Sequence, residues 1–281
     1  MKTSYEHLVA MCALPPDFNA YDPQIDPRNA RVRYIIQALD DMGTQYEVDC
    51  FDATGHESTV GDIPHFVNII ASVPASDAAA ADSIVFLAHH DVFQPFYQNV
   101  NDNTASCANL LALLERLLAD GPVRRRIYVV FTDAEEIVST TRSGARQLAR
   151  RIHEGDLGNV QYCVNLELTA SGRALYCDRP IPGVAAAAGG PVPIVATPFN
   201  DATTLRYWGL PAAVLGTLPQ EELAALQGKR WGYCPTWARC HHPTDSLGLA
   251  SASDMEHFVS VLERIAHGIY EGLTVPKKTR L

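Results

Sequence analysis

The sequence predicts an α/β protein with a mixed, largely parallel central sheet and helices on both faces. Short apolar runs of strand length alternate with amphipathic segments of helical spacing along most of the 281 residues. Several of the runs are apolar at every position, which is typical of strands that are buried on both faces of a sheet. The chain is also 47% hydrophobic, enough for a sizeable core. We therefore expect one large domain covering residues 1–281.

The elements follow one another in a regular order. The predicted strands are 44–51, 65–73, 83–90, 125–133, 160–168, 174–178, 191–196 and 210–216. The predicted helices are 28–43, 105–120, 143–155, 201–208 and a last helix with Phe258, Val261, Leu262, Ile265 and Ile269 on one face. This last helix is expected to open with a capping box from Ser253 to Glu256.

Charge and hydropathy exclude two classes of partner. A formal charge of −10 and a pI near 5.4 argue against a nucleic-acid-binding surface. No apolar stretch approaches the roughly 20 residues of a membrane helix. The short apolar segment 8–14 follows Glu6 and His7 and does not resemble a signal peptide. We expect a cytoplasmic protein without nucleic-acid or membrane partners, and the oligomeric state stays open.

The seven cysteines are widely spread and contain no CxxC pair. This usage favours reduced, buried thiols. A local disulfide between Cys234 and Cys240 is the alternative.

Polar side chains gather where three predicted strands end. His89 and Asp91 close one apolar run, Glu135 and Glu136 follow a second, and Glu167 lies at the end of a third. The carboxyl ends of parallel strands meet at one edge of a sheet, where ligands bind. The fold therefore predicts a single polar site built from these residues.

Side-chain alternation orients the first group. In an extended segment His89 and Asp91 point the same way and His90 points opposite. This suits an imidazole that binds a metal while its second nitrogen donates to a carboxylate, although a surface His–Asp pair has the same pattern. Asp102 either caps the Leu-rich helix that follows it or bridges two cations with its two oxygens.

The glutamates at the other two strand ends also allow either a structural or a metal-site interpretation. Glu135 and Glu136 form a solvated strand end, or one binds metal while the other acts as a general base. Glu167 is more telling, because an acid between Leu166 and Leu168 in an apolar strand is unfavourable unless it is paired or binds a metal.

A loop near the end of the chain completes the set. His241 and His242 are adjacent, and Asp245 follows across a proline. Either histidine can bind a metal. Two histidines and three carboxylates are donors that zinc accepts. Trp231, Tyr233 and Trp237, just before this loop, line an apolar substrate pocket or pack within the loop.

These motifs, in this order, resemble the zinc-dependent exopeptidases of the M28 aminopeptidase family. The matching residues are His89-x-Asp91, Asp102-Asn103, Glu135-Glu136, Glu167 and His241-x-Pro243-x-Asp245, supported by 68–71, 143–149 and 200–212. The likeness covers about residues 65–265. It departs from the family at three positions, because Glu167 is more often aspartate there, Val92 follows Asp91, and Ser106 replaces a glycine.

The resemblance implies a role for each motif. His89, Asp102 and Glu167 would bind one zinc ion, and Asp102, Glu136 and His241 would bind a second. Glu135 would be the general base and Asp91 would orient His89. The implied enzyme is a zinc metallopeptidase that cleaves an N-terminal peptide bond, or a small amide, with a water activated between two zinc ions.

Related families give the alternatives. Only 73 residues separate Glu167 from His241, too few for the inserted lid domain of M20 peptidases. Glutaminyl cyclases of the same fold family have similar ligands but bind one zinc and act as acyltransferases on a peptide. A non-catalytic scaffold of this fold is the third alternative, and the complete ligand set argues against it.

Overall fold

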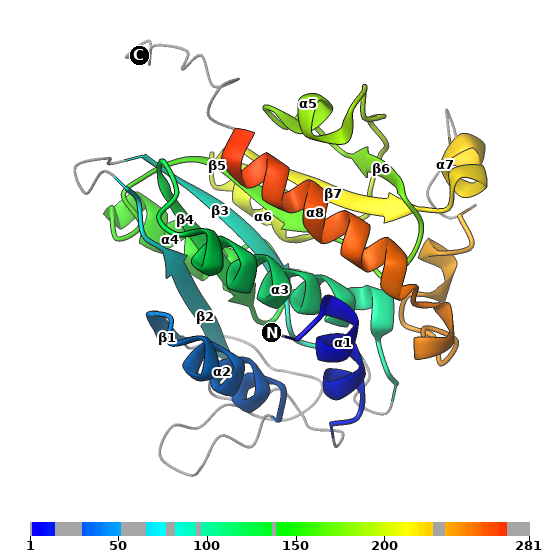
Figure 1. Ribbon diagram of the computed structural model, residues 1–281, viewed down its shortest axis with the longest axis horizontal. Helices are drawn as coiled ribbons and strands as arrows, with labels where there is room; N and C mark the ends of the chain where they lie inside the picture. Colours follow the sequence, from blue (N-terminus) through cyan, green and yellow to red (C-terminus); the bar gives the residue numbers. More distant parts are fainter. Residues whose placement is uncertain are drawn as a thin grey trace.

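Seven strands form a single sheet at the centre of the molecule (Figure 1). The computed structural model describes residues 2–14, 30–51, 66–76, 82–93, 97–136, 139–226 and 234–268. The strands are β1 (Tyr46–Phe51), β2 (Phe66–Val73), β3 (Asp82–His89), β4 (Arg126–Thr132), β5 (Asn159–Leu166), β6 (Ala174–Cys177) and β7 (Ala212–Leu218). The α-helices are α1 (Ser4–Cys12), α2 (Ala30–Met42), α3 (Ala105–Asp120), α4 (Gly144–Glu154), α5 (Val184–Ala188), α6 (Asp201–Tyr207), α7 (Gln220–Leu226) and α8 (Ala252–Gly268).

The sheet has a parallel centre and antiparallel edges, in the order β1-β2-β4-β3-β5-β7-β6. Strands β4, β3, β5 and β7 run parallel to one another, and β1, β2 and β6 pair antiparallel with their neighbours. This confirms the predicted mixed, largely parallel sheet. Because β3 lies between β4 and β5, the carboxyl ends of these three strands meet at one edge.

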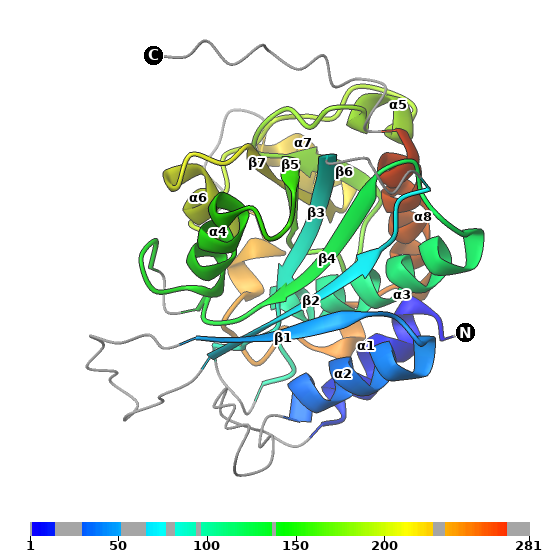
Figure 2. The same cartoon turned by 90° about the vertical axis from the view of Figure 1, so that its left-hand side faces the viewer.

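Helices cover both faces of the sheet (Figure 2). One apolar layer joins α2, α3 and α8 to side chains such as Phe86 of β3 and Phe131 of β4. The opposite layer joins α4 and α6 to side chains such as Leu87 and Val130. Alternate residues of β3 and β4 thus point into different layers, as the continuous apolar runs predict.

Two of the predicted local features are wrong. Residues 191–196 form no strand and contribute one isolated bridge, between Ile194 and Cys177; Pro191 and Pro193 lack the N–H groups that a strand needs. Helix α8 begins at Ala252, so Ser253 lies inside its first turn, and Ser251 Oγ accepts the N–H of Asp254 instead. Ile269 lies outside the described residues.

All seven cysteines are free thiols, including Cys234 and Cys240. The thiol of Cys234 instead donates to a carboxylate oxygen of Glu222, at an S···O distance of 3.0 Å. No helix in the described ranges combines the length and the apolar character that crossing a membrane requires.

Candidate metal centre

The polar residues that end three neighbouring strands converge on one buried point. His89 is the last residue of β3 and pairs in register with Thr132, the last residue of β4. Glu167 directly follows β5. Glu135 and Glu136 lie in the loop that leaves β4. The parallel order of the three strands is what brings these residues together.

His89 is held on both sides by carboxylates. Its Nδ1 lies 3.3 Å from Asp91 Oδ1. Its Nε2 lies 3.2 Å from Asp102 Oδ1 and 4.0 Å from Glu167 Oε2. His90 points the other way, with its Nε2 2.9 Å from the carbonyl oxygen of Val67. This geometry is that of a metal-binding imidazole whose second nitrogen is fixed by a carboxylate, and both side chains are buried.

Asp102 lies between two histidines and does not cap α3. The residue before α3 is Thr104, and Asp102 has non-helical backbone angles, φ −117° and ψ 83°, with a cis peptide bond to Asn103. Its Oδ1 faces His89, and its Oδ2 lies 3.2 Å from His241 Nε2. The helix-cap interpretation is therefore wrong, and both oxygens of Asp102 are available to the site.

The last loop presents His241 rather than His242. His241 Nε2 lies 2.9 Å from Glu136 Oε2, whereas His242 Nδ1 lies 2.8 Å from the hydroxyl of Thr244. Asp245 fixes this loop against the turn at Asp102, because its carboxylate accepts the backbone N–H of Asn101 at 2.9 Å and of Asp102 at 3.1 Å.

The convergent residues form two groups of three with donor atoms that lie within 4.8 Å of one another. One group is His89, Asp102 and Glu167, and the other is Asp102, Glu136 and His241. Asp102 belongs to both. Glu136 Oε1 is buried and has no hydrogen-bond partner in the described part of the chain. An unsatisfied buried carboxylate oxygen among imidazole nitrogens fits a cation, and this donor set suits zinc.

Burial and mutual repulsion shift the pKa values of the carboxyl groups upward. Burial and the Asp102 charge raise the pKa of Glu136 to about 7. Burial, opposed by the His89 charge, raises the pKa of Glu167 to about 8. Asp102 and Asp91 are exceptions, since in spite of burial His241 and His89 lower the pKa of Asp102, and His89 lowers the pKa of Asp91. Such a concentration of perturbed groups is typical of a functional site.

The same carboxylates raise the pKa values of the histidines. Asp102 and Glu136 raise the pKa of His241 to about 10. Burial would lower the pKa of His89, but Asp102 and Asp91 outweigh it and raise that pKa well above its ordinary value. Without a bound metal, these shifts favour imidazoles that are protonated at both nitrogens and positively charged at neutral pH.

Glu135 differs from its neighbour Glu136 in having no ionic partner. Its side chain is buried, and no described residue donates a hydrogen bond to its carboxylate. Burial raises the pKa of Glu135 well above its ordinary value. A buried carboxylate with open acceptor atoms beside a cation site is suited to accept a proton.

The structure brings to the site residues to which the sequence assigned no role. Asp201, the first residue of α6, is fully buried, and burial raises its pKa to about 6. The hydroxyl of Thr132 donates to one of its oxygens. Asn165 Nδ2 donates to Glu167 Oε1 at 3.0 Å. An acid in the first turn of a helix has an ordinary explanation in sequence, which is why Asp201 was matched without being given a role.

The structure decides between pocket wall and packing for one of the three aromatic residues before the last loop. Trp237 packs against the apolar layer under α4 and α6, with its ring centroid 6.4 Å from that of Tyr176. For Trp237 this favours packing over a pocket wall. Trp231 and Tyr233 lie outside the described residues.

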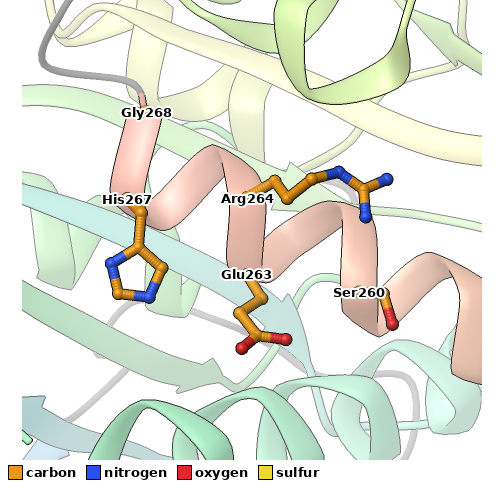
Figure 3. Close-up of a pocket in the computed structure, with 5 residues that line it drawn as sticks. All are labelled: Ser260, Glu263, Arg264, His267 and Gly268. Atoms are coloured by element: carbon orange, nitrogen blue, oxygen red, sulfur yellow. The ribbon is translucent and has the colours of Figure 1, made fainter. Parts of the chain in front are cut away.

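A second histidine–carboxylate cluster lies on the surface of α8 (Figure 3). Glu263 and His267 project from the same stretch of this helix, and donor atoms of Asp120, Glu263 and His267 lie within 4.8 Å of one another. However, Arg116 Nη1 already lies 3.4 Å from Glu263 Oε2. A cluster that is exposed to solvent and paired with a guanidinium has no unmet need for a cation, so we assign the metal centre to Asp102 and its neighbours.

Comparisons with known proteins agree with this geometry. Residues 68–187 match the model of peptidase family M28. No curated protein sequence matches the chain. Among solved structures, a glutaminyl cyclase from an Acidobacteriales bacterium superposes with a TM-score of 0.70 at 18% identity, over 94% of this chain and 92% of that one.

Two solved peptidases superpose on this chain with similar TM-scores. A Zn-dependent exopeptidase from Parabacteroides distasonis gives a TM-score of 0.68 at 14% identity, over 94% of this chain and 97% of that one. The LapA aminopeptidase of Legionella pneumophila gives 0.67 at 14% identity, over 94% of this chain and 69% of that one. At these identities the likeness shows the fold.

Proposed function

We propose that this chain, whose residues 68–187 match the model of peptidase family M28, is a metallopeptidase of that family and an aminopeptidase with two zinc ions. The single observation that carries this proposal is the pair of three-residue donor groups that share Asp102. One shared carboxylate with two separately directed oxygens suits two neighbouring cations. The proposed substrate is a peptide, or a small aminoacyl amide, with a free N-terminus.

In this proposal His89, Asp102 and Glu167 hold one ion, and Asp102, Glu136 and His241 hold the other. Zinc, when bound, supplies Lewis acidity, which polarises a carbonyl oxygen and lowers the pKa of water. Asp91 keeps Nδ1 of His89 directed away from the ion, so that Nε2 faces Asp102 and Glu167.

Glu135 performs the proton transfer in this proposal. Its carboxylate accepts a proton from the attacking water and delivers it to the nitrogen of the leaving amine. The loop that places Glu136 against His241 places the preceding side chain, Glu135, in a different direction, so the two glutamates do not compete for one role.

We also propose that residues 1–281 form one catalytic domain without an inserted lid. The proposal rests on the continuous sheet, to which strands from both halves of the chain contribute. Neither a nucleic acid nor a membrane is part of the proposed activity.

The proposed function predicts a metal content and a product. Purified protein saturated with zinc is expected to bind about two equivalents and to release the first residue of a peptide. Metal analysis after dialysis and mass spectrometry of the products measure both. A content that stays near one equivalent under saturating zinc would contradict the two-ion centre.

The second candidate function is a glutaminyl cyclase-like acyltransferase with a single zinc. It is favoured by the likeness to a solved glutaminyl cyclase and by the fact that Asp102, Glu136 and His241 alone can hold one ion. A peptide that begins with glutamine separates the two functions. The aminopeptidase releases free glutamine, whereas the cyclase leaves a pyroglutamyl peptide of the original length less ammonia.

The raised pKa values predict that zinc binding releases protons at pH 7. His241, with a pKa of about 10, and Glu167, with a pKa of about 8, hold protons that must leave before they bind a cation. The apparent zinc affinity therefore rises as pH rises from 6 to 8 and falls as the solution becomes acidic.

Titration calorimetry in two buffers with different ionisation enthalpies measures this release. The observed heat is expected to differ between the buffers in proportion to the protons released. Equal heats in both buffers at pH 7 would mean that the ligands are already deprotonated in the metal-free protein.

A further inference from the structure

The two histidines of the centre are oriented in different ways. His89 is buried and is held at both ring nitrogens, with Asp91 at Nδ1 and Asp102 at Nε2. His241 has carboxylates only at Nε2, and no described residue accepts a hydrogen bond from its Nδ1. Its side chain is also 42% exposed. Contacts at one nitrogen fix a single point of an imidazole ring and leave its plane undefined.

An aromatic ring supplies the missing restraint. The ring of Phe93 stacks on the ring of His241, with centroids 4.2 Å apart and an angle of 12° between the planes. Phe93 follows β3 by four residues, on the segment that carries His89 and Asp91. It is 45% exposed, an unusual position for a large apolar side chain that serves only the core.

The backbone of His241 makes such a restraint necessary. His241 has a φ of 61°, in the left-handed region that non-glycine residues rarely adopt. A residue in this region keeps its conformation only where the surrounding contacts define it. The loop supplies backbone contacts, such as the N–H of Asp245 to the carbonyl of His242 at 2.9 Å, but these do not reach the imidazole.

We propose that Phe93 is a positioning residue that fixes the plane of the His241 imidazole for the ion held with Asp102 and Glu136. This proposal rests on the proposed function, because it assumes that His241 binds zinc. The face of a phenyl ring carries negative charge density, so it attracts an imidazole that shares the positive charge of a cation. The same attraction holds the protonated imidazole of the metal-free protein, so the stack contributes to zinc affinity by orienting the ring.

The test compares Phe93→Leu, which removes the ring and keeps an apolar side chain, with Phe93→Tyr, which keeps the ring. Tyr207→Leu is the control, since Tyr207 is an exposed aromatic residue whose recorded ring contact is with Trp208. Zinc affinity is measured by competition with a chelator. In Phe93→Leu one of the two equivalents is expected to bind roughly 3- to 10-fold more weakly, as for the loss of one aromatic pair. The other equivalent is expected to be unchanged.

Activity and NMR provide independent readouts. The activity lost by Phe93→Leu at limiting zinc is expected to return at saturating zinc with an unchanged KM. In the metal-free protein, the ring protons of His241 are expected to move downfield in Phe93→Leu, because they no longer lie over the phenyl face. Phe93→Tyr is expected to match the wild type in all three measurements.

Two results would overturn the proposal. In one, Phe93→Leu binds both equivalents as tightly as the wild type. In the other, its KM rises at saturating zinc while its zinc affinity stays unchanged, which would make Phe93 a substrate contact. If the wild type bound no zinc, the proposed function would fail, but a downfield shift in metal-free Phe93→Leu would still support the orienting contact.

Discussion

The Glu135→Gln variant is expected to keep its fold and both zinc ions while its turnover falls by roughly 10²- to 10⁴-fold, the usual contribution of a positioned general base. Glutamine preserves the size of the side chain but cannot accept the proton. Because Glu135 makes no ion pair with the histidines, its replacement removes no metal donor in the proposed centre. Zinc content, thermal midpoint and aminopeptidase rate measure the three effects.

The adjacent variant Glu136→Gln is the matched control. Glu136 Oε2 lies 2.9 Å from His241 Nε2, so its loss is expected to lower zinc content first and activity as a consequence. A Glu135→Gln protein that loses metal while Glu136→Gln retains it would reverse the two roles. Full activity in Glu135→Gln would remove the general base from the mechanism.

Asp102→Asn is expected to disrupt both halves of the centre at once. Asp102 directs one oxygen to His89 and the other to His241, and an asparagine replaces one of these acceptors with an NH₂ donor. The loss of zinc affinity is expected to exceed the roughly 10- to 100-fold that follows removal of a hydrogen-bond partner of a ligand. Zinc analysis after dialysis should show less than about one equivalent, in contrast to the about two of a dinuclear site.

Asp49→Asn provides a control for the loss of a buried carboxylate. Asp49 lies on β1 and accepts from Gln147 Nε2 at 3.0 Å, away from the donor groups. This variant is expected to keep both ions. An Asp102→Asn protein that still binds two equivalents would show that Asp102 does not bridge the ions.

The sequence predicted the parts of the centre that follow from strand direction. His89, Asp91 and Glu167 are defined by a strand end and by alternation along it, both of which are local properties. The sheet class followed from the same runs of apolar residues. The antiparallel pairing of β1, β2 and β6 did not, because pairing direction depends on contacts between residues far apart in the chain.

Several features required the fold itself. The choice of His241 over His242 followed from the family resemblance and not from the residues alone, and the stack of Phe93 on His241 joins positions 148 residues apart. Helix α1 was not predicted, although its capping box from Thr3 to Glu6 can be read from the sequence. The predicted capping box at Ser253 was misplaced, since a matching motif stood two residues after Ser251, whose hydroxyl accepts the N–H of Asp254.

The hydrogen bonds from Asn101 and Asp102 to Asp245 hold two turns of the centre together. They join two turns that are separated by more than 140 residues, and they involve backbone N–H groups rather than donor atoms of the centre. The two turns are therefore joined by contacts that do not themselves require a cation. To the extent that these contacts offset the entropy of closing so long a loop, that entropy is not subtracted from the free energy of cation binding.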